Sequence, residues 1–222
     1  TNDFGIANST TATITVDPSQ ALYDSTLKAP RCATVASACD SGPTLLNGRA
    51  NITNGAEPNQ PNTINNSCAD GTSGAYHSDM SNDRLKISTL DGTAFAVGKT
   101  VRIEATVWSF STALSLDLFY TGNAASPTWT LIGTQAPTAG TGAKTLLATN
   151  VLPAGTLQAI RAVFRFGGTP NPCGFNSGAD DHDDLIFAVS PAAGTELIQN
   201  GTFTSGLTGW VPYELPNIVH NN

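Results

Sequence analysis

Charged residues are scarce in this chain of 222 residues: Asp, Glu, Lys and Arg together make up only 12%. The ten Lys and Arg residues are scattered singly, the formal net charge is −7, and the pI is near 4.7. Nucleic acids and anionic membrane surfaces are bound through grouped positive charges. The sequence therefore argues against nucleic acid as a partner and against attachment to an anionic membrane.

Long apolar runs and catalytic signatures are also missing. No run reaches the roughly 18 apolar residues of a spanning helix, so we expect no membrane insertion. The only histidines are His77, His182 and His220, and neither Gly-x-Ser-x-Gly nor His-Glu-x-x-His occurs. A Ser–His–Asp triad through His77 is the alternative, but serine is so abundant that chance proximity is expected. We predict a protein that is not an enzyme.

Helical periodicity is replaced throughout by alternation of apolar and polar residues, which is typical of strands with one buried face. In residues 100–108 this pattern places Val101, Ile103, Ala105 and Val107 on one face. Further strands are predicted at residues 84–87, 114–120, 129–132, 144–148, 159–166 and 185–189. Many short strands separated by Gly, Asn and Asp turns predict an all-β fold, an antiparallel, jelly-roll-like β-sandwich.

Four cysteines, an even number, indicate two disulfides, for which three pairings are possible. We favour a local bond between Cys32 and Cys39 and a long-range bond between Cys68 and Cys173. A zinc site is the competing interpretation, but no Cys-x-x-Cys spacing supports it. Disulfides form in oxidising compartments, so we expect an extracellular or cell-surface location.

The most unusual feature is an acidic run that leads into the predicted strand at 185–189. Asp180, Asp181, Asp183 and Asp184 fall within five positions, and like charges this close repel one another. A hard cation relieves that repulsion, and Ca²⁺ accepts six to eight oxygen ligands in irregular geometry. We predict a structural Ca²⁺ held by these four aspartates, with His182 pointing to solvent. The alternative is a solvated acidic turn.

A long segment rich in Asn, Pro and Gly, residues 49–83, has few apolar residues to anchor it. Loops of this length are usually functional or tied down. Cys68 provides one attachment, and Glu57 is a remote candidate ligand for the same cation. If Cys68 pairs with Cys173, this segment and the acidic run lie at the same end of the sandwich.

Two functions are compatible with such a module. The first is adhesion, or binding of an extracellular polymer or glycan, for which Trp129 and Tyr76 are candidate ligand-binding aromatics, although both also suit a core. The second is a structural subunit of a filament or surface layer, a homo-oligomer assembled from copies of itself by strand addition.

The two ends of the chain differ from its centre. Residues 1–8, followed by alternating Thr and aliphatic residues at 11–16, resemble the last hairpin of an immunoglobulin-like domain of bacterial surface proteins. Residues 196–203, followed by Trp210, resemble the first strand and turn of carbohydrate-binding jelly rolls. We expect residues 1–20 to be a terminal or orphan donor strand, and residues 191–222 to be a linker and the start of another jelly-roll-like module.

The central landmarks are Leu46–Arg49, Glu57–Ile64, Cys68–Thr72, Tyr76–Asp79, Val101–Trp108, Leu116–Tyr120, Trp129–Gly133, Leu152–Gly155 and Asp180–Val189. Together they resemble accessory β-modules found C-terminal to secreted bacterial peptidases and in cell-surface proteins. The resemblance implies that residues 31–190 form a non-catalytic, jelly-roll-like module of a larger, multi-module secreted protein. It does not name a ligand.

Overall fold

A computed structural model describes residues 17–174 and 178–192. The chain divides into two compact units, residues 1–191 and 192–222, and the fold below belongs to the first. The expected terminal strand at residues 1–20 lies outside the described residues up to position 16. The expected final module lies outside them from position 193.

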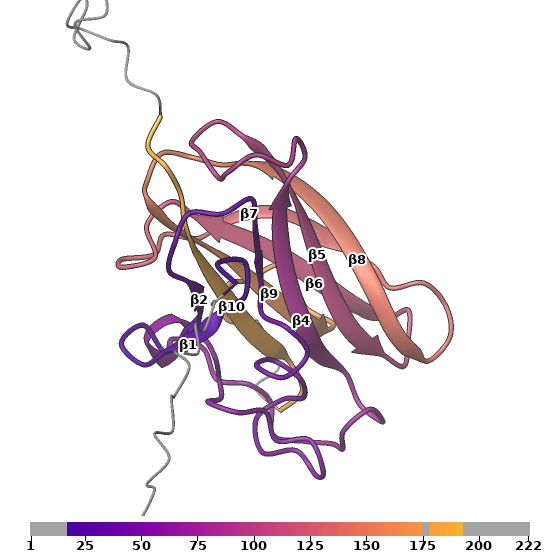
Figure 1. The fold of residues 1–222 in the computed structure, drawn as a ribbon. Helices are drawn as coiled ribbons and strands as arrows, with labels where there is room; N and C mark the ends of the chain where they lie inside the picture. The colour runs from indigo at the N-terminus through magenta and orange to yellow at the C-terminus, as the bar shows by residue number, and fades with distance from the viewer. Residues whose placement is uncertain (1–16, 175–177, 193–222) are drawn as a thin grey trace, which may run out of the picture. The chain divides into compact units, whose positions relative to one another are not determined.

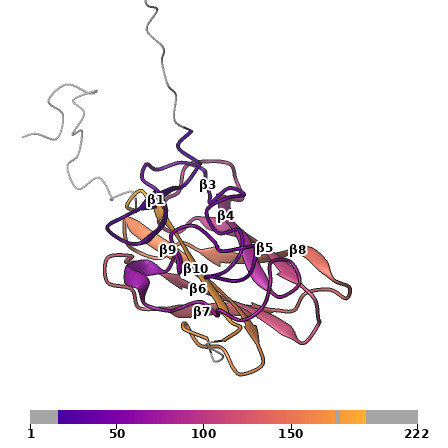
Figure 2. The same cartoon turned by 90° about the horizontal axis from the view of Figure 1, so that it is seen from below.

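The described chain is all-β and forms two sheets (Figures 1 and 2). The six-stranded sheet has the order β1(Leu22–Asp24), β2(Ala29–Cys32), β10(Asp181–Ala188), β9(Leu157–Phe166), β6(Leu114–Thr121), β7(Thr130–Gln135). The four-stranded sheet has the order β3(Ala38–Asp40), β4(Ser81–Thr89), β5(Thr100–Ser109), β8(Gly142–Val151). Neighbouring strands are antiparallel except β2 and β10, which are parallel. The predicted β-sandwich is therefore confirmed.

The core lies between the sheets and follows the alternation of the sequence. The four residues predicted on one face of β5, Val101, Ile103, Ala105 and Val107, are all buried. They meet residues of β6, β9 and β10, and the rings of Phe95 and Phe187 pack 5.1 Å apart. Burying a side chain of this size contributes about 1.5–3 kcal/mol, so this core provides most of the driving force for folding.

β9 and β10 are buried on both faces, which the alternating pattern did not predict. Ile64, in the short 3₁₀ turn η1 (Ile64–Asn66), packs with Ala29, Ala159 and Ile186 on the outer side of the six-stranded sheet. The Asn-rich segment therefore covers that face. Among the described residues, no helix has the length and apolarity that crossing a membrane requires.

The asparagines of this segment have a conformational role. Asn54, Asn59, Asn62, Asn65 and Asn66 all have positive φ values, between 48° and 62°. Asparagine tolerates the left-handed region better than other residues with a side chain, because its amide hydrogen-bonds locally. The residue type that made this segment look like an unstructured loop therefore gives it a fixed path.

Both favoured disulfides are present. Cys32 pairs with Cys39, and Cys68 pairs with Cys173. The second bond joins the Asn-rich segment to the chain just before β10, and Gly71 N–H donates to the carbonyl of Asp180 at 2.7 Å. The segment and the acidic run therefore lie at the same end of the sandwich, as predicted.

Candidate functional site

Three of the four aspartates of the acidic run belong to β10 itself, and only Asp180 precedes it. Asp181, Asp183 and Asp184 are completely buried, so the alternative of a solvated turn is wrong. Successive side chains of a strand point to opposite faces. Asp181 and Asp183 share the face of Leu185 and Phe187, which belong to the core between the sheets.

Asp184 lies on the opposite face and has a different partner. Its carboxylate accepts two hydrogen bonds from Arg161, both at 2.7 Å, and one from Ile64 N–H at 2.6 Å. The Arg161 guanidinium in turn lies 4.4 Å from the centre of the Trp129 ring. A carboxylate engaged in this buried ion pair has no need of a cation, so the prediction that Asp184 is a metal ligand does not agree with the structure.

Asp180 also points away from the inner face. Its Oδ1 accepts a hydrogen bond from Phe166 N–H at 3.0 Å, where β9 ends. An added Cβ on Gly174 would lie 2.7 Å from Asp180 Oδ2 and 2.5 Å from His182 Nε2. Asp180 therefore lies with His182 on the side of the Cys173 loop, and it is not grouped with Asp181 and Asp183.

Four residues from elsewhere join Asp181 and Asp183. Asn82 in β4 donates its backbone N–H to Asp181 Oδ2 at 2.6 Å. Asp70 accepts the N–H of His182 at 3.0 Å, and Asn62 donates its side-chain amide to Glu57 Oε1 at 3.0 Å. The predicted ligands Glu57, Asp181 and Asp183 are thus grouped with three residues that the sequence did not single out. We call these six residues the acidic centre.

The acidic centre holds an unusual number of oxygens without a well-aligned donor. All six residues are between 0% and 4% exposed. These oxygens are Glu57 Oε2, Asn62 Oδ1, Asp70 Oδ2, Asn82 Oδ1, Asp181 Oδ1, Asp183 Oδ1 and Asp183 Oδ2. Glu57 and Asp70 lie within hydrogen-bonding reach of each other, and the side chain of Asn82 lies within reach of Asp183. Buried polar atoms in native proteins nearly always have a partner, so a group of this size requires an explanation.

Burial and mutual repulsion change the acidity of the four carboxyl groups. Burial raises the pKa of Glu57 well above its ordinary value, and the charges of Asp70 and Asp181 raise it further. The pKa values of Asp181 and Asp183 are raised well above the ordinary value in the same way, first by burial. Burial also raises the pKa of Asp70, to about 7. Four carboxylates cannot stay charged here without a positive partner.

Arg49 is a cation close enough to act on the acidic centre, and it is fully buried. Its charge lowers the pKa values of Asp70 and Asp181. Its guanidinium, however, donates to the carbonyls of Ala179 and Ser73 and to none of the four carboxylates. One arginine therefore balances part of the negative charge and leaves the carboxylate oxygens named above without well-aligned donors.

The expectation that His182 points to solvent is wrong. This residue is 1% exposed. Burial lowers the pKa of His182 to about 4, which outweighs the opposing charge of Asp180 and the hydrogen bonds to the backbone of Cys173 and Ala69 that act to raise its pKa. The ring is therefore neutral at pH 7. The ring lies next to Gly174 of the Cys173 loop, and its Nδ1 is 3.9 Å from Asp70 Oδ1, at the edge of the acidic centre.

The sequence matches no protein-family model, and no curated protein is significantly similar to it. The acidic centre is therefore interpreted from its own chemistry.

The side chains of the acidic centre present oxygen atoms and neither sulfur nor imidazole nitrogen. Carboxylate and amide oxygens are the ligands of Ca²⁺, and aspartate, glutamate and asparagine provide them here. Within residues 17–174 and 178–192, no three His, Cys, Asp or Glu side chains form a ready metal site. A cation would therefore need the amide oxygens of Asn62 and Asn82 and a small approach of the carboxylates towards it.

The two candidate ligand-binding aromatics have occupied faces. Tyr76 stacks on His77 with ring centres 3.7 Å apart, and His77 stacks on Trp108 at 4.0 Å. Gly55 lies against the Tyr76 ring so closely that an added Cβ would be 2.5 Å from Cδ2. His77 therefore covers one face of Tyr76, and Arg161 covers one face of Trp129.

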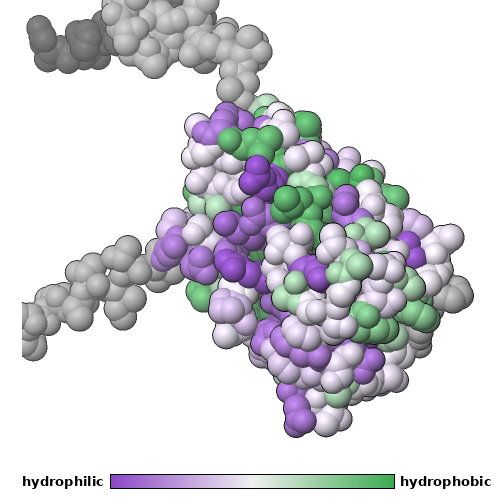
Figure 3. All heavy atoms as spheres, turned by 90° about the vertical axis from the view of Figure 1, so that its right-hand side faces the viewer, coloured by the Kyte–Doolittle hydropathy of each residue, from purple (hydrophilic) through white to green (hydrophobic). Residues whose placement is uncertain are grey.

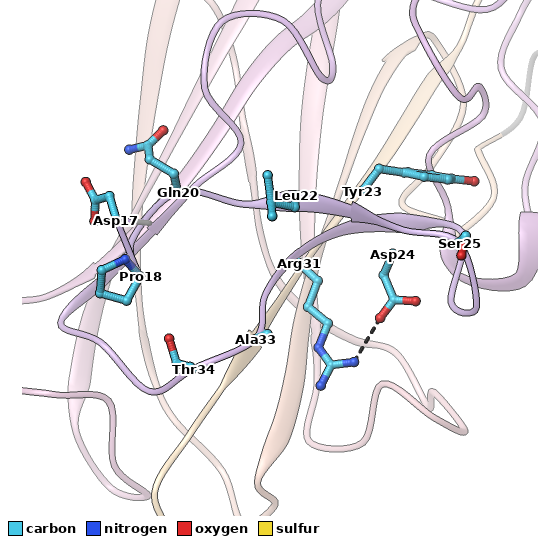
Figure 4. A pocket seen from close by; sticks show the side chains of 10 residues that line it. All are labelled: Asp17, Pro18, Gln20, Leu22, Tyr23, Asp24, Ser25, Arg31, Ala33 and Thr34. Atoms are coloured by element: carbon cyan, nitrogen blue, oxygen red, sulfur yellow. Dashed lines mark hydrogen bonds and ion pairs between the residues drawn. The ribbon is translucent and has the colours of Figure 1, made fainter. Parts of the chain in front are cut away.

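A separate hollow of about 460 Å³ lies along the hairpin of β1 and β2 (Figure 4). Leu22 is its most exposed apolar residue, and Asp24 and Arg31 form an ion pair at 2.8 Å within it. The wall of the hollow begins at Asp17, the first described residue. Because Asp24 is paired with Arg31 and Asp17 accepts hydrogen bonds from Ser19, this hollow offers less for a ligand than the acidic centre does.

Proposed function

We propose that this chain contains a non-catalytic extracellular module, stabilised by a buried Ca²⁺ ion, that serves adhesion or polymer binding within a multi-module secreted bacterial protein. The observation that carries the proposal is the set of seven buried oxygens without well-aligned donors. A cation bound among them would neutralise charges whose burial otherwise opposes folding.

The ligand set favours Ca²⁺ over the other common metals. Zinc prefers sulfur and nitrogen ligands, whereas the acidic centre presents oxygen only. Mg²⁺ requires near-ideal octahedral geometry and keeps several waters, which a fully buried site does not admit. Ca²⁺ takes six to eight oxygens at irregular angles, and the six side chains provide that number.

Burial supports a structural role. Catalytic metals keep one position open to water or substrate, but Asp181 and Asp183 are 0% exposed. Extracellular modules bind Ca²⁺ with dissociation constants of about 10⁻⁴–10⁻³ M, which suits the concentrations outside cells. Two disulfides support the same location, because they persist in oxidising surroundings.

Thermal unfolding with and without chelator tests the ion. At a Ca²⁺ concentration roughly a hundred times the dissociation constant, we expect a melting temperature about 5–10 °C higher than in excess chelator. Mg²⁺ at the same concentration serves as the control and should stabilise less. Identical melting curves in both conditions, with no metal found by elemental analysis, would reject the site.

Retention on immobilised polysaccharides and binding on a glycan array test the polymer-binding role. The chain crosses between the two sheets from β5 to β6, from β7 to β8 and from β8 to β9. We propose that this connectivity is jelly-roll-like, which is consistent with the polymer-binding role. Folds of this kind are used by lectins. A calcium-loaded, monomeric protein that binds no polysaccharide would argue against this role.

A filament subunit is the second candidate, and strand β8 favours it. β8 is ten residues long, ends the four-stranded sheet, and pairs with no described strand on its outer side. Lys144 is its only charge, and Leu147 and Val151 are more than half exposed. Figure 3 shows the side of the molecule that lies on the right in Figure 1, where β8 is labelled. On this surface, apolar residues are spread among polar ones. A strand from a second copy would extend this sheet.

Electron microscopy of the purified chain separates the two candidates. Regular filaments that disappear in the Leu147→Lys variant, with an unchanged melting temperature, would support assembly through β8. Monodisperse monomers in both proteins would support the binding module.

A further inference from the structure

A second hollow, of about 210 Å³, lies beside the acidic centre and has two aromatic rings at its rim. Phe110 follows the end of β5 in the four-stranded sheet, and Phe166 ends β9 in the six-stranded sheet. They are 40% and 48% exposed, which is unusual for phenylalanine. The two sheets thus each contribute one exposed ring to the same small hollow.

The hollow also contains a polar group with unused hydrogen-bonding capacity. Arg49 lines it and brings a positive charge, but its guanidinium donates to the carbonyls of Ala179 and Ser73, and its Nε is buried out of reach of a ligand. Asp79 lines it as well, and its Oδ2 accepts the N–H of Ala75 at 3.0 Å, which leaves Oδ1 able to accept a hydroxyl hydrogen. Gly74, with φ +110°, allows the Asp79 carboxylate to lie this close to the backbone, since an added Cβ would be 2.3 Å from Asp79 Oδ2.

These groups select the chemistry of the ligand. Asp79 disfavours an anion and Arg49 disfavours a cation, because each would face a like charge. A purely apolar group would leave the Asp79 carboxylate desolvated without a partner. The remaining class is an uncharged ring that has apolar C–H faces for the phenylalanines and hydroxyl donors for Asp79.

The volume limits the ligand further. Sites for drug-sized molecules occupy about 300–1,000 Å³, so this hollow has room for a single ring. We propose that it binds one uncharged pyranose unit of a glycan, between Phe110 and Phe166. This inference rests on the polymer-binding role proposed above and gives that role a site, distinct from the aromatics Tyr76 and Trp129.

Titration of the ¹⁵N-labelled full chain, saturated with Ca²⁺, tests the site. The probes are the methyl glycosides of glucose, galactose, mannose and xylose, together with N-acetylglucosamine. We expect at least one of them to shift the amide resonances of Gly74, Phe110 and Phe166. Replacing both phenylalanines by leucine keeps apolar surface but removes the rings, so we expect about tenfold weaker binding.

Leu147→Ala is the matched control, because it changes an exposed apolar residue on β8 and should leave the affinity unchanged. The inference is overturned if no glycoside shifts these resonances, if the double leucine variant binds as tightly as the unmodified chain, or if the peptide Ala-Phe-Ala shifts them instead. Retention of the double variant on a polysaccharide that also retains the unmodified chain would overturn this site but leave the polymer-binding role standing.

Discussion

A buried carboxylate stabilises or destabilises a protein according to what faces it. Asp183 and Asp184 are neighbours in β10 and are both completely buried. Asp184 meets a guanidinium, whereas Asp183 lies among other carboxylates and beside the side-chain amide of Asn82. The two residues are identical in sequence terms, so their difference arises only from which face of the strand each occupies.

Asn substitutions at these two positions therefore have different outcomes. We expect Asp183→Asn to weaken Ca²⁺ binding at least tenfold. In excess chelator the variant should be as stable as the unmodified chain or more stable, because a repelling charge is removed. Isothermal titration and thermal unfolding measure the two effects.

Asp184→Asn is the matched control. It leaves Arg161 buried without its partner, which costs about 3 kcal/mol whether or not Ca²⁺ is present. If Asp183→Asn loses as much stability in excess chelator as Asp184→Asn does, the assignment of Asp183 to a cation is contradicted.

Asp40 provides a test of pH dependence away from the acidic centre. Burial acts to raise its pKa, but hydrogen bonds from Arg84 and Gly42 and the Arg84 charge outweigh burial and lower it. Its folded pKa therefore lies below the unfolded value. The stabilisation is fully present above about pH 4 and is lost as the pH falls through the folded pKa.

We therefore expect Asp40→Asn to lower stability by about 1 kcal/mol or less near neutral pH, since the Arg84 side chain is 43% exposed. The difference from the unmodified chain should vanish in strong acid. Denaturant unfolding at a series of pH values measures this, and a difference that persists at the lowest pH would show that Asp40 acts through packing alone.

At the scale of elements, the Asn-rich segment is positioned by covalent and main-chain bonds rather than by a large core of its own. Cys68 is bonded to Cys173, and Asp70 lies only two residues beyond Cys68. Asn62 accepts the N–H of Asp184 through its backbone carbonyl at 3.1 Å. The positions of Asn62 and Asp70 in the acidic centre thus depend on this attachment.

Replacing Cys68 and Cys173 by alanine should lower stability by about 2–5 kcal/mol and also weaken Ca²⁺ binding, because Asp70 loses its attachment. Replacing Cys32 and Cys39 should lower stability without changing the affinity for Ca²⁺. Calorimetry on both variants measures these effects. Equal affinities in the two variants would mean that the acidic centre does not depend on the Cys68–Cys173 bond.

Truncating a buried side chain in the core between the sheets should lower the free energy of unfolding, because it leaves a cavity. Phe187 is 1% exposed and packs against Phe95, so Phe187→Ala should cost about 3–5 kcal/mol. Leu147→Ala, on the exposed face of β8, should change stability by no more than about 0.5 kcal/mol. A small effect at Phe187 in urea unfolding would mean that the core relaxes around the cavity.

At the scale of the whole molecule, the acidic centre closes one end of a sandwich whose other parts do not depend on it. β5 pairs with β4 and β8 along its whole length, and its inner residues are fully buried. A local charge imbalance at one end should therefore loosen that end before it unfolds the sheets.

Hydrogen exchange tests this expectation. Removal of Ca²⁺ should increase exchange in residues 57–70 and 181–184 while leaving β5 and β8 protected. The far-ultraviolet circular dichroism should stay constant. A uniform loss of protection across both sheets would instead indicate that the ion stabilises only the global fold.

The alternation of Val101, Ile103, Ala105 and Val107 determined a strand with one buried face, because a period of two is a local property of the chain. The cysteine count and spacing likewise indicated the two disulfides. Sequence also drew attention to Glu57 and the acidic run. Only the tertiary structure separated Asp181 and Asp183 from Asp180 and Asp184, placed Asn62, Asp70 and Asn82 beside them, and buried His182. These outcomes depend on which chain segments cover each face of β10, and no local pattern specifies a contact between residues more than a hundred positions apart.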